Sequence, residues 1–278
     1  MLNWLNRYAG VASELLDADE RLTGSLLDVG SGDQGFANLG GSDRFVGVDI
    51  EFGGAPAPTM LAMRVPIGPL PFVDGAFDTV LSLDALEHVP RPERAGFVRE
   101  ICRVAGSRAI IACPSAEAAE IDAMLRRWYV RRGEVPPAWL NEHDEHGLPT
   151  RAEVEEFCRL EGYRSRPLAM PNGLLSLMAV IADLDPDIAP MAQHELRARP
   201  ALWRELFQAS ADFDSFRVGW VIEREQPLTA TVRLGAIDET ISEALRCDCG
   251  TCSMELPYAG GVHDLRPLRC RGAAASAA

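Results

Sequence analysis

A glycine-rich turn and three aspartates are the residues of this 278-residue chain best suited to holding a ligand. The segment from Leu26 to Gly35 reads LLDVGSGDQG, an apolar run followed by glycines that let the backbone turn tightly and approach a bound molecule closely. Asp28 stands in this run, Asp49 ends the run RFVGVDI, and Asp84 follows the run FDTVLSL. Ligands of open α/β folds bind beyond the carboxyl ends of the strands, so we expect the three carboxylates near one crevice.

Two classes of nucleoside ligand fit the glycine turn. Three of its glycines match G-x-G-x-x-G, the dinucleotide fingerprint, and the carboxylate of Asp49 is spaced to accept ribose hydroxyl protons in either class. Asp33 distinguishes the two classes and disfavours a dinucleotide. We expect a helix to begin at FANL, and a carboxylate at a helix N-terminus repels a pyrophosphate. A ligand with an ammonium and a sulfonium instead suits acidic groups such as Asp28.

Three histidines are candidates for a general base, which a reaction at a hydroxyl group needs near neutral pH. They are His88 in LEHVP and the pair His143 and His146 in NEHDEHGLPT. A structural role is the alternative for each of them, and for His88 it would be a hydrogen bond to backbone at the start of a helix. H-x-x-H also occurs in metal sites, although in a loop it is a weak signal.

Four cysteines cluster near the C-terminus as C-x-C-x-x-C followed by one more, and this pattern resembles half of a zinc ribbon. Two alternatives remain open: four thiolates that hold a structural zinc ion, or a degenerate ribbon with free thiols. The four residues are Cys247, Cys249, Cys252 and Cys270. The other cysteines stand in apolar segments and are expected to be small buried hydrophobes: Cys102, Cys113 and Cys158.

Strands that alternate with helices must position these residues, and this alternation predicts a parallel sheet covered on both faces. The expected strands are 25–30, 44–50, 59–65, 77–83, 107–114, 163–170 and 216–225. Helices are expected over 1–22, after the glycine turn, and over 91–105, 115–132 and 151–162, with several more in 172–212. Thr150 and Glu153 form a capping box for the helix over 151–162, which Gly162 is expected to close.

The bulk composition excludes some classes of protein. The chain carries 27 basic and 41 acidic residues, a net charge of −14, which disfavours nucleic acid as the general partner. It contains no apolar run of the roughly 18 residues that a membrane span needs. Its first residues lack the basic region and apolar core of a signal peptide, so the cytoplasm is the expected location.

With these motifs in order, the sequence resembles class I S-adenosylmethionine-dependent methyltransferases of the methyltransferase type 11 group. LLDVGSGDQG resembles their first motif, VGVDI their second, and LPFVDGAFDTVLSLDALEHVP their fourth-strand region. The resemblance covers about residues 24–169 and the strand near 216–224. It implies a Rossmann-like doubly wound α/β fold with a seven-stranded, mostly parallel sheet, and S-adenosylmethionine as the cofactor.

The resemblance also implies roles for individual residues. A histidine precedes the capped helix in many relatives, which makes His146 the foremost candidate for the base. Gln34 replaces the usual third glycine, and no acid precedes LPF, so adenine recognition is expected at backbone groups near Met63 and Arg64. The implied contacts are Gly30, Ser31 and Gly32 to the methionine part, Asp28 as its anchor, Asp49 to the ribose, Ile50 to the adenine, and Leu83 and Asp84 on the methyl-donor side.

These observations predict three segments. They are a methyltransferase domain over 1–225, in which 172–212 is a helical cap insertion, a cysteine-containing extension over 226–270, and a disordered tail over 271–278. The leading function is methyl transfer to a small molecule or glycan, with O-methylation slightly favoured. The alternatives are an NAD-dependent oxidoreductase, which Asp33 and LSLDALEHVP disfavour, and a methyltransferase-like binding subunit without turnover.

Overall fold

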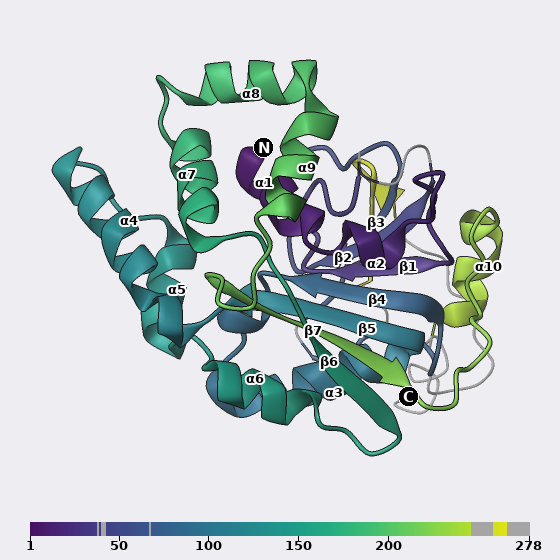
Figure 1. Cartoon of the computed structure of the whole chain (residues 1–278). Helices are drawn as coiled ribbons and strands as arrows, with labels where there is room; N and C mark the ends of the chain where they lie inside the picture. Colours follow the sequence, from purple (N-terminus) through teal and green to yellow (C-terminus); the bar gives the residue numbers. More distant parts are fainter. Residues whose placement is uncertain (38, 40–42, 67, 246–257, 266–278) are drawn as a thin grey trace, which may run out of the picture. The chain divides into compact units, whose positions relative to one another are not determined.

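The computed structural model describes residues 1–278 except 38, 40–42, 67, 246–257 and 266–278 (Figure 1). Its described strands form a sheet in the order β6-β7-β5-β4-β1-β2-β3-β9-β8. The first seven correspond to the seven predicted strands, so the predicted α/β fold is confirmed. They are β1 (Leu26–Val29), β2 (Phe45–Asp49), β3 (Met60–Arg64), β4 (Phe77–Leu83), β5 (Ala105–Pro114), β6 (Tyr163–Leu168) and β7 (Arg217–Arg224).

The chain divides into two compact units. The glycine-loop unit comprises Leu16–Ser82, Phe97–Ala109 and the described part of Glu223–Ala278. The helix-rich unit comprises Met1–Leu15, Leu83–Gly96 and Ile110–Ile222. Each unit draws on distant parts of the sequence. The predicted domain over 1–225 and the extension after it stay predictions.

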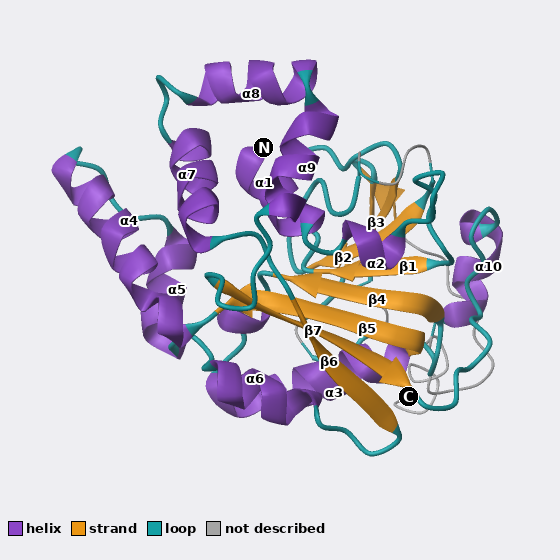
Figure 2. Ribbon diagram, viewed as in Figure 1, coloured by secondary structure: helices purple, strands orange, loops and turns teal. Residues whose placement is uncertain are grey.

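In the glycine-loop unit, β1, β2 and β3 run parallel and side by side (Figure 2). Leu27 faces Val46 of β2 on one side and Val80 of β4 on the other. All four residues of β1 are buried, as expected of a central parallel strand whose sequence is a continuous apolar run. This register brings the carboxyl ends of β1 and β2 together, where the glycine turn begins.

Two short strands from the C-terminal part of the chain extend the sheet beyond the predicted seven. The strand β9 (Val262–Asp264) pairs parallel to β3 and forms a hairpin with β8 (Tyr258–Ala259). Gly260 and Gly261 make the turn with φ of 61° and 85°, which glycine adopts readily. Helix α10 (Ile237–Ala244) belongs to the same unit and buries Ile237, Thr240, Ile241 and Ala244.

The helix-rich unit holds α4 (Ala119–Arg131), α5 (Ala138–His146), α6 (Arg151–Cys158), α7 (Gly173–Leu184), α8 (Ala189–Ala198) and α9 (Pro200–Ala209). A buried cluster of Leu125, Tyr129, Leu140 and Val180 joins α4, α5 and α7. The last three helices occupy the segment predicted as a helical insertion. Helix α3 (Arg94–Val104) follows the 3-10 turns η1 (Leu86–His88) and η2 (Arg91–Glu93), and η3 (Ala116–Ala118) precedes α4.

Several predicted helix boundaries are wrong. The single helix over 1–22 is instead α1 (Leu2–Ala9) and α2 (Ala12–Leu15), after which the Asp17 carboxylate accepts hydrogen bonds from the backbone of Asp19 and Arg21 and turns the chain. Described residues after the glycine turn form consecutive turns in place of the helix predicted at FANL. The capping box of Thr150 and Glu153 is present, but α6 ends at Cys158, because Arg159 (φ −83°, ψ 85°) leaves the helical conformation. Gly162 (φ 80°) lies in the turn that follows.

The segment that carries His143 and His146 also differs from its prediction. It forms helix α5, where a loop was expected, because Leu140 packs into the buried cluster and Arg126 of α4 binds the Leu140 carbonyl and the Asp144 carboxylate. None of the helices described here is long and apolar enough to span a membrane.

Candidate functional site

The glycine turn is fixed to the end of β2 by two backbone hydrogen bonds. The amides of Gly30 and Ser31 both donate to the carbonyl of Val48, at 2.9 and 3.2 Å. Gly30 has φ of 77° and Gly32 has φ of 56°, a left-handed conformation in which side chains are strained. The turn is therefore held in one shape by β2 and by its own glycines.

Gly32 and Gly35 have different surroundings. A Cβ atom on Gly35 would lie 2.9 Å from Asp28 Oδ2 and 2.9 Å from the Phe45 ring, so the turn needs glycine there for its own packing. A Cβ atom on Gly32 would meet nothing within 4 Å. Another molecule can therefore approach the backbone at Gly32.

Asp49 is the last residue of β2, and its carboxylate holds the glycine turn. Asp49 Oδ2 accepts a hydrogen bond from the Gly32 amide at 2.8 Å, and Oδ1 accepts one from the Ile50 amide at 2.7 Å. The side chain of Ile50 is 54% exposed beside it. The Asp49 carboxylate, which can accept hydrogen bonds, and the apolar side chain of Ile50 therefore lie side by side at the open side of the turn.

Asp28 and Asp33 occupy different environments. Asp28 lies inside β1, is fully buried, and faces the position of Gly35, so it lies beneath the turn. The Asp33 carbonyl accepts a hydrogen bond from the Ala57 amide at 2.8 Å. Because turns follow Asp33 in place of a helix, its carboxylate is not at a helix N-terminus, and the repulsion argued from a helix dipole does not apply.

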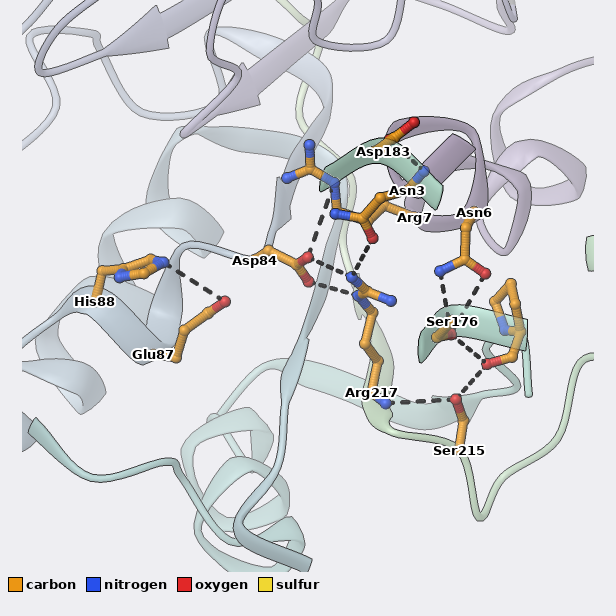
Figure 3. Close-up of polar contacts among 11 residues, drawn as sticks. Asn3, Asn6, Arg7, Asp84, Glu87, His88, Ser176, Asp183, Ser215 and Arg217 are labelled. Carbon is orange, nitrogen blue, oxygen red and sulfur yellow. Dashed lines mark hydrogen bonds and ion pairs between the residues drawn. The ribbon is translucent and has the colours of Figure 1, made fainter. Parts of the chain in front are cut away.

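In the helix-rich unit, Leu83 ends β4 as a buried residue and Asp84 follows it with a left-handed backbone, φ 53°. This conformation is uncommon outside glycine and is often found at functional sites. The Arg217 guanidinium holds the Asp84 carboxylate with two hydrogen bonds, from Nε at 2.7 Å and Nη2 at 2.6 Å (Figure 3). Arg7 Nε lies 3.8 Å from Asp84 Oδ2, and Asn3 Oδ1 accepts a further bond from Arg217 Nη2.

The electrostatics of this pair are set by its burial. Burial by itself raises the pKa of Asp84, but the charge and hydrogen bonds of Arg217, with the charge of Arg7, outweigh it and hold the pKa below its ordinary value. The Arg217 side chain is 2% exposed and lies over the Phe216 ring. Its Nη1 is buried and has no hydrogen-bond partner among the residues that the structure describes.

A second group of titratable residues, Glu87, His88, His143 and Asp122, lies in the same unit; we call it the His88–His143 cluster. One candidate ligand atom each from Glu87, His88 and His143 lies within 4.8 Å of the other two. His143 Nδ1 is 2.8 Å from Asp122 Oδ2, and the two imidazole rings are 5.1 Å apart between centroids. The sequence predicts His88 and His143 as candidate bases, and in the structure their side chains lie together.

Two members of the cluster have shifted pKa values. Burial, and then the nearby charge of Asp84, raises the pKa of Glu87 well above its ordinary value. Burial, and then the neighbouring His143, lowers the pKa of His88. Figure 3 shows Glu87 and His88 beside the Asp84–Arg217 pair. Without a bound cation, Glu87 and His88 are therefore both biased towards their neutral forms.

His146, the foremost candidate from the resemblance, does not join the cluster. Its side chain is half-buried at the C-terminal end of α5, and its carbonyl accepts a hydrogen bond from Arg94. Arg94 is buried and also binds the carbonyls of Glu87, Val89 and Gly147. It therefore ties the turn that carries His88 to the end of the helix that carries His143.

A cavity of about 260 Å³ adjoins the cluster on the side of His143. Asp122, Asp144 and Arg126 supply its polar wall. Its other lining residues are apolar apart from His143: Ala116, Ala119, Ala123 and Leu148. The cavity gives a small molecule or water access to the buried histidine.

Four contributors to these groups escaped sequence reasoning: Glu87, Asp122, Arg94 and Arg217. Glu87 lies within the LEHVP motif and Arg94 follows it four residues later, so the motif itself was a signal for both. Arg217 also had a signal, because it begins the apolar strand RVGWVIER and must be buried at its start. Asp122 had none, because it belongs to a helix with many charged residues.

The cysteines divide between described and undescribed parts of the chain. Cys102, Cys113 and Cys158 are buried, as predicted. Burial raises the pKa of Cys102 to about 12. The four residues predicted as zinc ligands (Cys247, Cys249, Cys252 and Cys270) lie outside the described residues, as does the predicted tail over 271–278.

Residues 27–113 match the family model Methyltransf_11, described as a methyltransferase domain. The matched segment begins in β1 and ends in β5, so it contains the glycine turn, Asp49, Asp84 and the first histidine of the cluster. This segment is therefore similar to a methyltransferase domain of the type 11 group, in agreement with the sequence motifs. Among curated proteins the chain has no significant match.

Several solved structures are similar to the chain. A methyltransferase from Thermotoga maritima shares 14% identity, with 81% of this chain and 92% of that one covered and a TM-score of 0.42. One from Aquifex aeolicus shares 17% identity over 61% and 90%, with a TM-score of 0.35. The plantazolicin methyltransferase BpumL, solved with a desmethylplantazolicin analogue and SAH, shares 11% over 80% and 84%, with a TM-score of 0.46. These TM-scores are low, and nothing about the site rests on them.

Proposed function

We propose that this protein transfers the methyl group of S-adenosylmethionine to a small-molecule or glycan acceptor, with an oxygen atom as the favoured site of methylation. The observation that carries the proposal is the hydrogen bond between Asp49 and the Gly32 amide at the open side of the glycine turn. The match of this segment to a methyltransferase domain supports it. A subunit without turnover and an oxidoreductase remain outcomes of the test below.

The cofactor contacts follow from the exposure of each group. The backbone of Gly30, Ser31 and Gly32 would receive the methionine part, because no side chain blocks the approach at Gly32. Asp49 would exchange its hydrogen bond from the turn for the ribose hydroxyls, and the exposed side chain of Ile50 would pack on the adenine. Asp28 would act from beneath the turn, because its side chain is fully buried. Leu83 and Asp84 stay proposed for the methyl-donor side.

The reaction requires alignment more than covalent chemistry from the protein. The acceptor oxygen attacks the methyl carbon, the bond from that carbon to sulfur breaks, and the electron pair stays on sulfur, which yields S-adenosylhomocysteine. Holding the two reactants in line can supply up to about 7–11 kcal/mol. The hydroxyl proton must also leave, which calls for a base within reach of the acceptor.

Among the three candidate histidines, His143 is the best arranged for this role. Asp122 holds its Nδ1 at 2.8 Å, as an orienting carboxylate does, and its Nε2 is available. It also lines the cavity that an acceptor could enter. His88 adjoins it, whereas His146 lies outside the cluster and has only its backbone in a described contact.

Calorimetric titration of the full chain with S-adenosylmethionine and, separately, NAD tests the cofactor. We expect saturable binding of the methyl donor, weakened at least tenfold in Asp49→Asn. Glu51→Gln removes a neighbouring exposed carboxylate from the same loop and should leave the affinity unchanged. Binding of NAD alone, or unchanged affinity in the Asp49 variant, would overturn the proposal.

Transfer is tested with a labelled methyl group and panels of sugars and other hydroxyl compounds. Label in an alkali-stable ether would support oxygen as the acceptor atom, and label on nitrogen or carbon would correct that part. Donor binding with no transfer to any compound or cell extract would favour the binding subunit.

A further inference from the structure

The geometry points to a binding site for one divalent transition-metal ion of the zinc type, held by Glu87, His88 and His143. The site goes beyond the proposed methyl transfer and shares one residue with it, His143, which is also the proposed base; its test needs no methyl donor. It also differs from the cysteine cluster, because all three ligands lie in described residues of the helix-rich unit.

The first argument is the set of buried atoms that lack partners. His143 Nε2 and Glu87 Oε2 are buried, and in the described part of the chain neither has a hydrogen-bond partner. Both side chains are more than nine-tenths buried. Buried polar atoms are normally paired, because leaving one without a partner is unfavourable. A cation between them would satisfy both at once.

The second argument is the environment of the opposite ring nitrogens. His143 Nδ1 lies 2.8 Å from Asp122 Oδ2, and His88 Nδ1 lies 2.7 Å from Glu142 Oε2. In metal sites a carboxylate at one imidazole nitrogen fixes the ring and leaves the other nitrogen to bind the metal. His143 has this arrangement, which leaves its Nε2 as the ligand atom. His88 Nδ1 lies at ion-pair distance from Glu142 but makes no hydrogen bond with the described residues, and its Nε2 faces Glu87.

The distances fit a site that closes on its ion. His88 Nε2 lies 3.8 Å from Glu87 Oε1, and each ligand atom of the three lies within 4.8 Å of the others. The separation between His88 and Glu87 exceeds a hydrogen-bond length, and Glu87 Oε2 and His143 Nε2 make no hydrogen bond with the described residues. Ligand atoms about 2.0–2.2 Å from a tetrahedral zinc ion lie about 3.3–3.6 Å apart, so side-chain movements of about 1 Å bring these three into range.

The donor set selects the class of metal. Two imidazole nitrogens and one carboxylate suit zinc and its first-row neighbours, whereas calcium and magnesium prefer oxygen ligands. Three protein ligands leave a fourth position open, as in catalytic zinc sites. The cavity beside His143 could supply water or an acceptor oxygen to that position.

The local charges also favour a cation. Glu87, Asp122 and Glu142 surround the two imidazoles, and Asp84 lies near enough to influence Glu87 and His88. Arg217 already neutralises Asp84, and Arg94 points to backbone carbonyls. With an ion bound, His143 would be a ligand and not a base, so the metal site and the base role predict opposite effects of metal removal on transfer.

Metal binding is tested on the full chain without any methyl donor, so its outcome is separate from that of the proposed function. The four C-terminal cysteines are first replaced by serine to remove thiolate ligands. Zinc is then titrated into metal-free protein in competition with a chromophoric chelator, and cobalt is titrated for its visible spectrum. We expect one equivalent of each metal, and a cobalt spectrum without sulfur charge-transfer bands.

Matched variants locate the site. Glu87→Gln keeps the shape of the side chain, and His143→Ala removes the buried ligand; each should weaken zinc binding at least tenfold. His146→Ala lies on the same helix outside the cluster and should bind like the parent. Zinc should raise the midpoint of thermal unfolding in the parent and in His146→Ala, but not in Glu87→Gln.

Three results would overturn the site. One is a folded cysteine-free parent that binds no equivalent of zinc or cobalt. Another is equal affinity in the parent and Glu87→Gln. The third is a loss in His146→Ala as large as that in the cluster variants. If His143→Ala fails to fold, His88→Gln, at a half-exposed ligand, takes its place with the same expected loss.

Discussion

Asp84 and Arg217, which stand 133 residues apart in the sequence, form a two-pronged ion pair with N–O distances of 2.7 and 2.6 Å. Asp84 keeps a left-handed backbone directly after β4, and Arg217 begins β7. The pair therefore joins two strand ends of the helix-rich unit. Both side chains are largely buried, so removing either residue would leave the other as an unpaired buried charge.

Replacing Arg217 by methionine should destabilise the protein strongly. The change leaves the Asp84 carboxylate buried without its main partner, and removal of one member of a buried pair typically costs about 3–5 kcal/mol. Denaturant unfolding of Arg217→Met measures this loss. The double variant with Asp84→Asn should recover part of it, because the unpaired charge is gone. Equal stabilities of the single and double variants would contradict the interdependence of the pair.

Gly32 and Gly35 should respond differently to alanine. Both have left-handed backbones, so each substitution carries about 1–2 kcal/mol of strain. Only at Gly35 would the added methyl group also collide with Asp28 and Phe45, and overpacking adds about 1–3 kcal/mol. Thermal unfolding should therefore rank Gly35→Ala below Gly32→Ala.

The same pair of variants separates stability from ligand binding. Under the proposed function, Gly32→Ala should weaken binding of S-adenosylmethionine despite its smaller loss of stability, because the methyl group would occupy the open approach to the turn. Gly35→Ala, if folded, should retain more affinity. A Gly32 variant with the affinity of the parent would show that the ligand does not approach there.

Asp43 should contribute stability that is lost in acid. Its hydrogen bonds from the Arg21 side chain, aided by the Leu22 amide, lower its pKa despite partial burial. A lowered pKa in the folded state stabilises the protein above the unfolded pKa, near 4, and this contribution disappears as the pH falls through the lower folded value. Thermal midpoints measured from about pH 6 down to pH 3 should therefore fall less steeply in Asp43→Asn than in the parent. Parallel curves would contradict the assignment.

The parts of the fold that follow from local sequence were predictable, and the contacts of the site were not. Each strand from β1 to β5 is an apolar run between turn residues, and Thr150 with Glu153 is a complete local capping signal. Helix α5 escaped because its polar sequence becomes helical through Leu140 and through Arg126 of another helix. The strands β8 and β9 are too short to show the alternation of apolar and polar residues that identifies a strand in a sequence.

The site residues could be predicted only where they belong to one short sequence motif. The glycine turn and Asp49 could be recognised because their motif is local and its spacing is fixed by two adjacent strands. The partners of His143 and Asp84 come from other elements, and no periodicity links Asp122 or Arg217 to them. His146 was preferred over His143 because of the family resemblance, although in the described interactions Asp122 contacts His143 and not His146.

Arg94 should position the His88–His143 cluster through its guanidinium fork. It donates to the carbonyls of Val89 at 3.0 Å, Glu87 at 3.2 Å and Gly147 at 2.5 Å, and so joins η1 to the end of α5. Arg94→Lys keeps the positive charge but cannot make these divergent contacts together. Because hydrogen bonds to charged groups are worth about 1.5–3 kcal/mol, we expect a loss of that order in denaturant unfolding.

Arg91→Lys is the matched control, because Arg91 is an exposed arginine of the neighbouring turn whose ion pair with Glu153 should contribute less than about 1 kcal/mol. A second measurement separates positioning from general stability. Well below the unfolding transition, Arg94→Lys should bind zinc more weakly than Arg91→Lys, because the two histidine-bearing segments are no longer held together. Equal zinc affinities in the two variants, with only stability reduced, would show that Arg94 supports the fold without positioning the cluster.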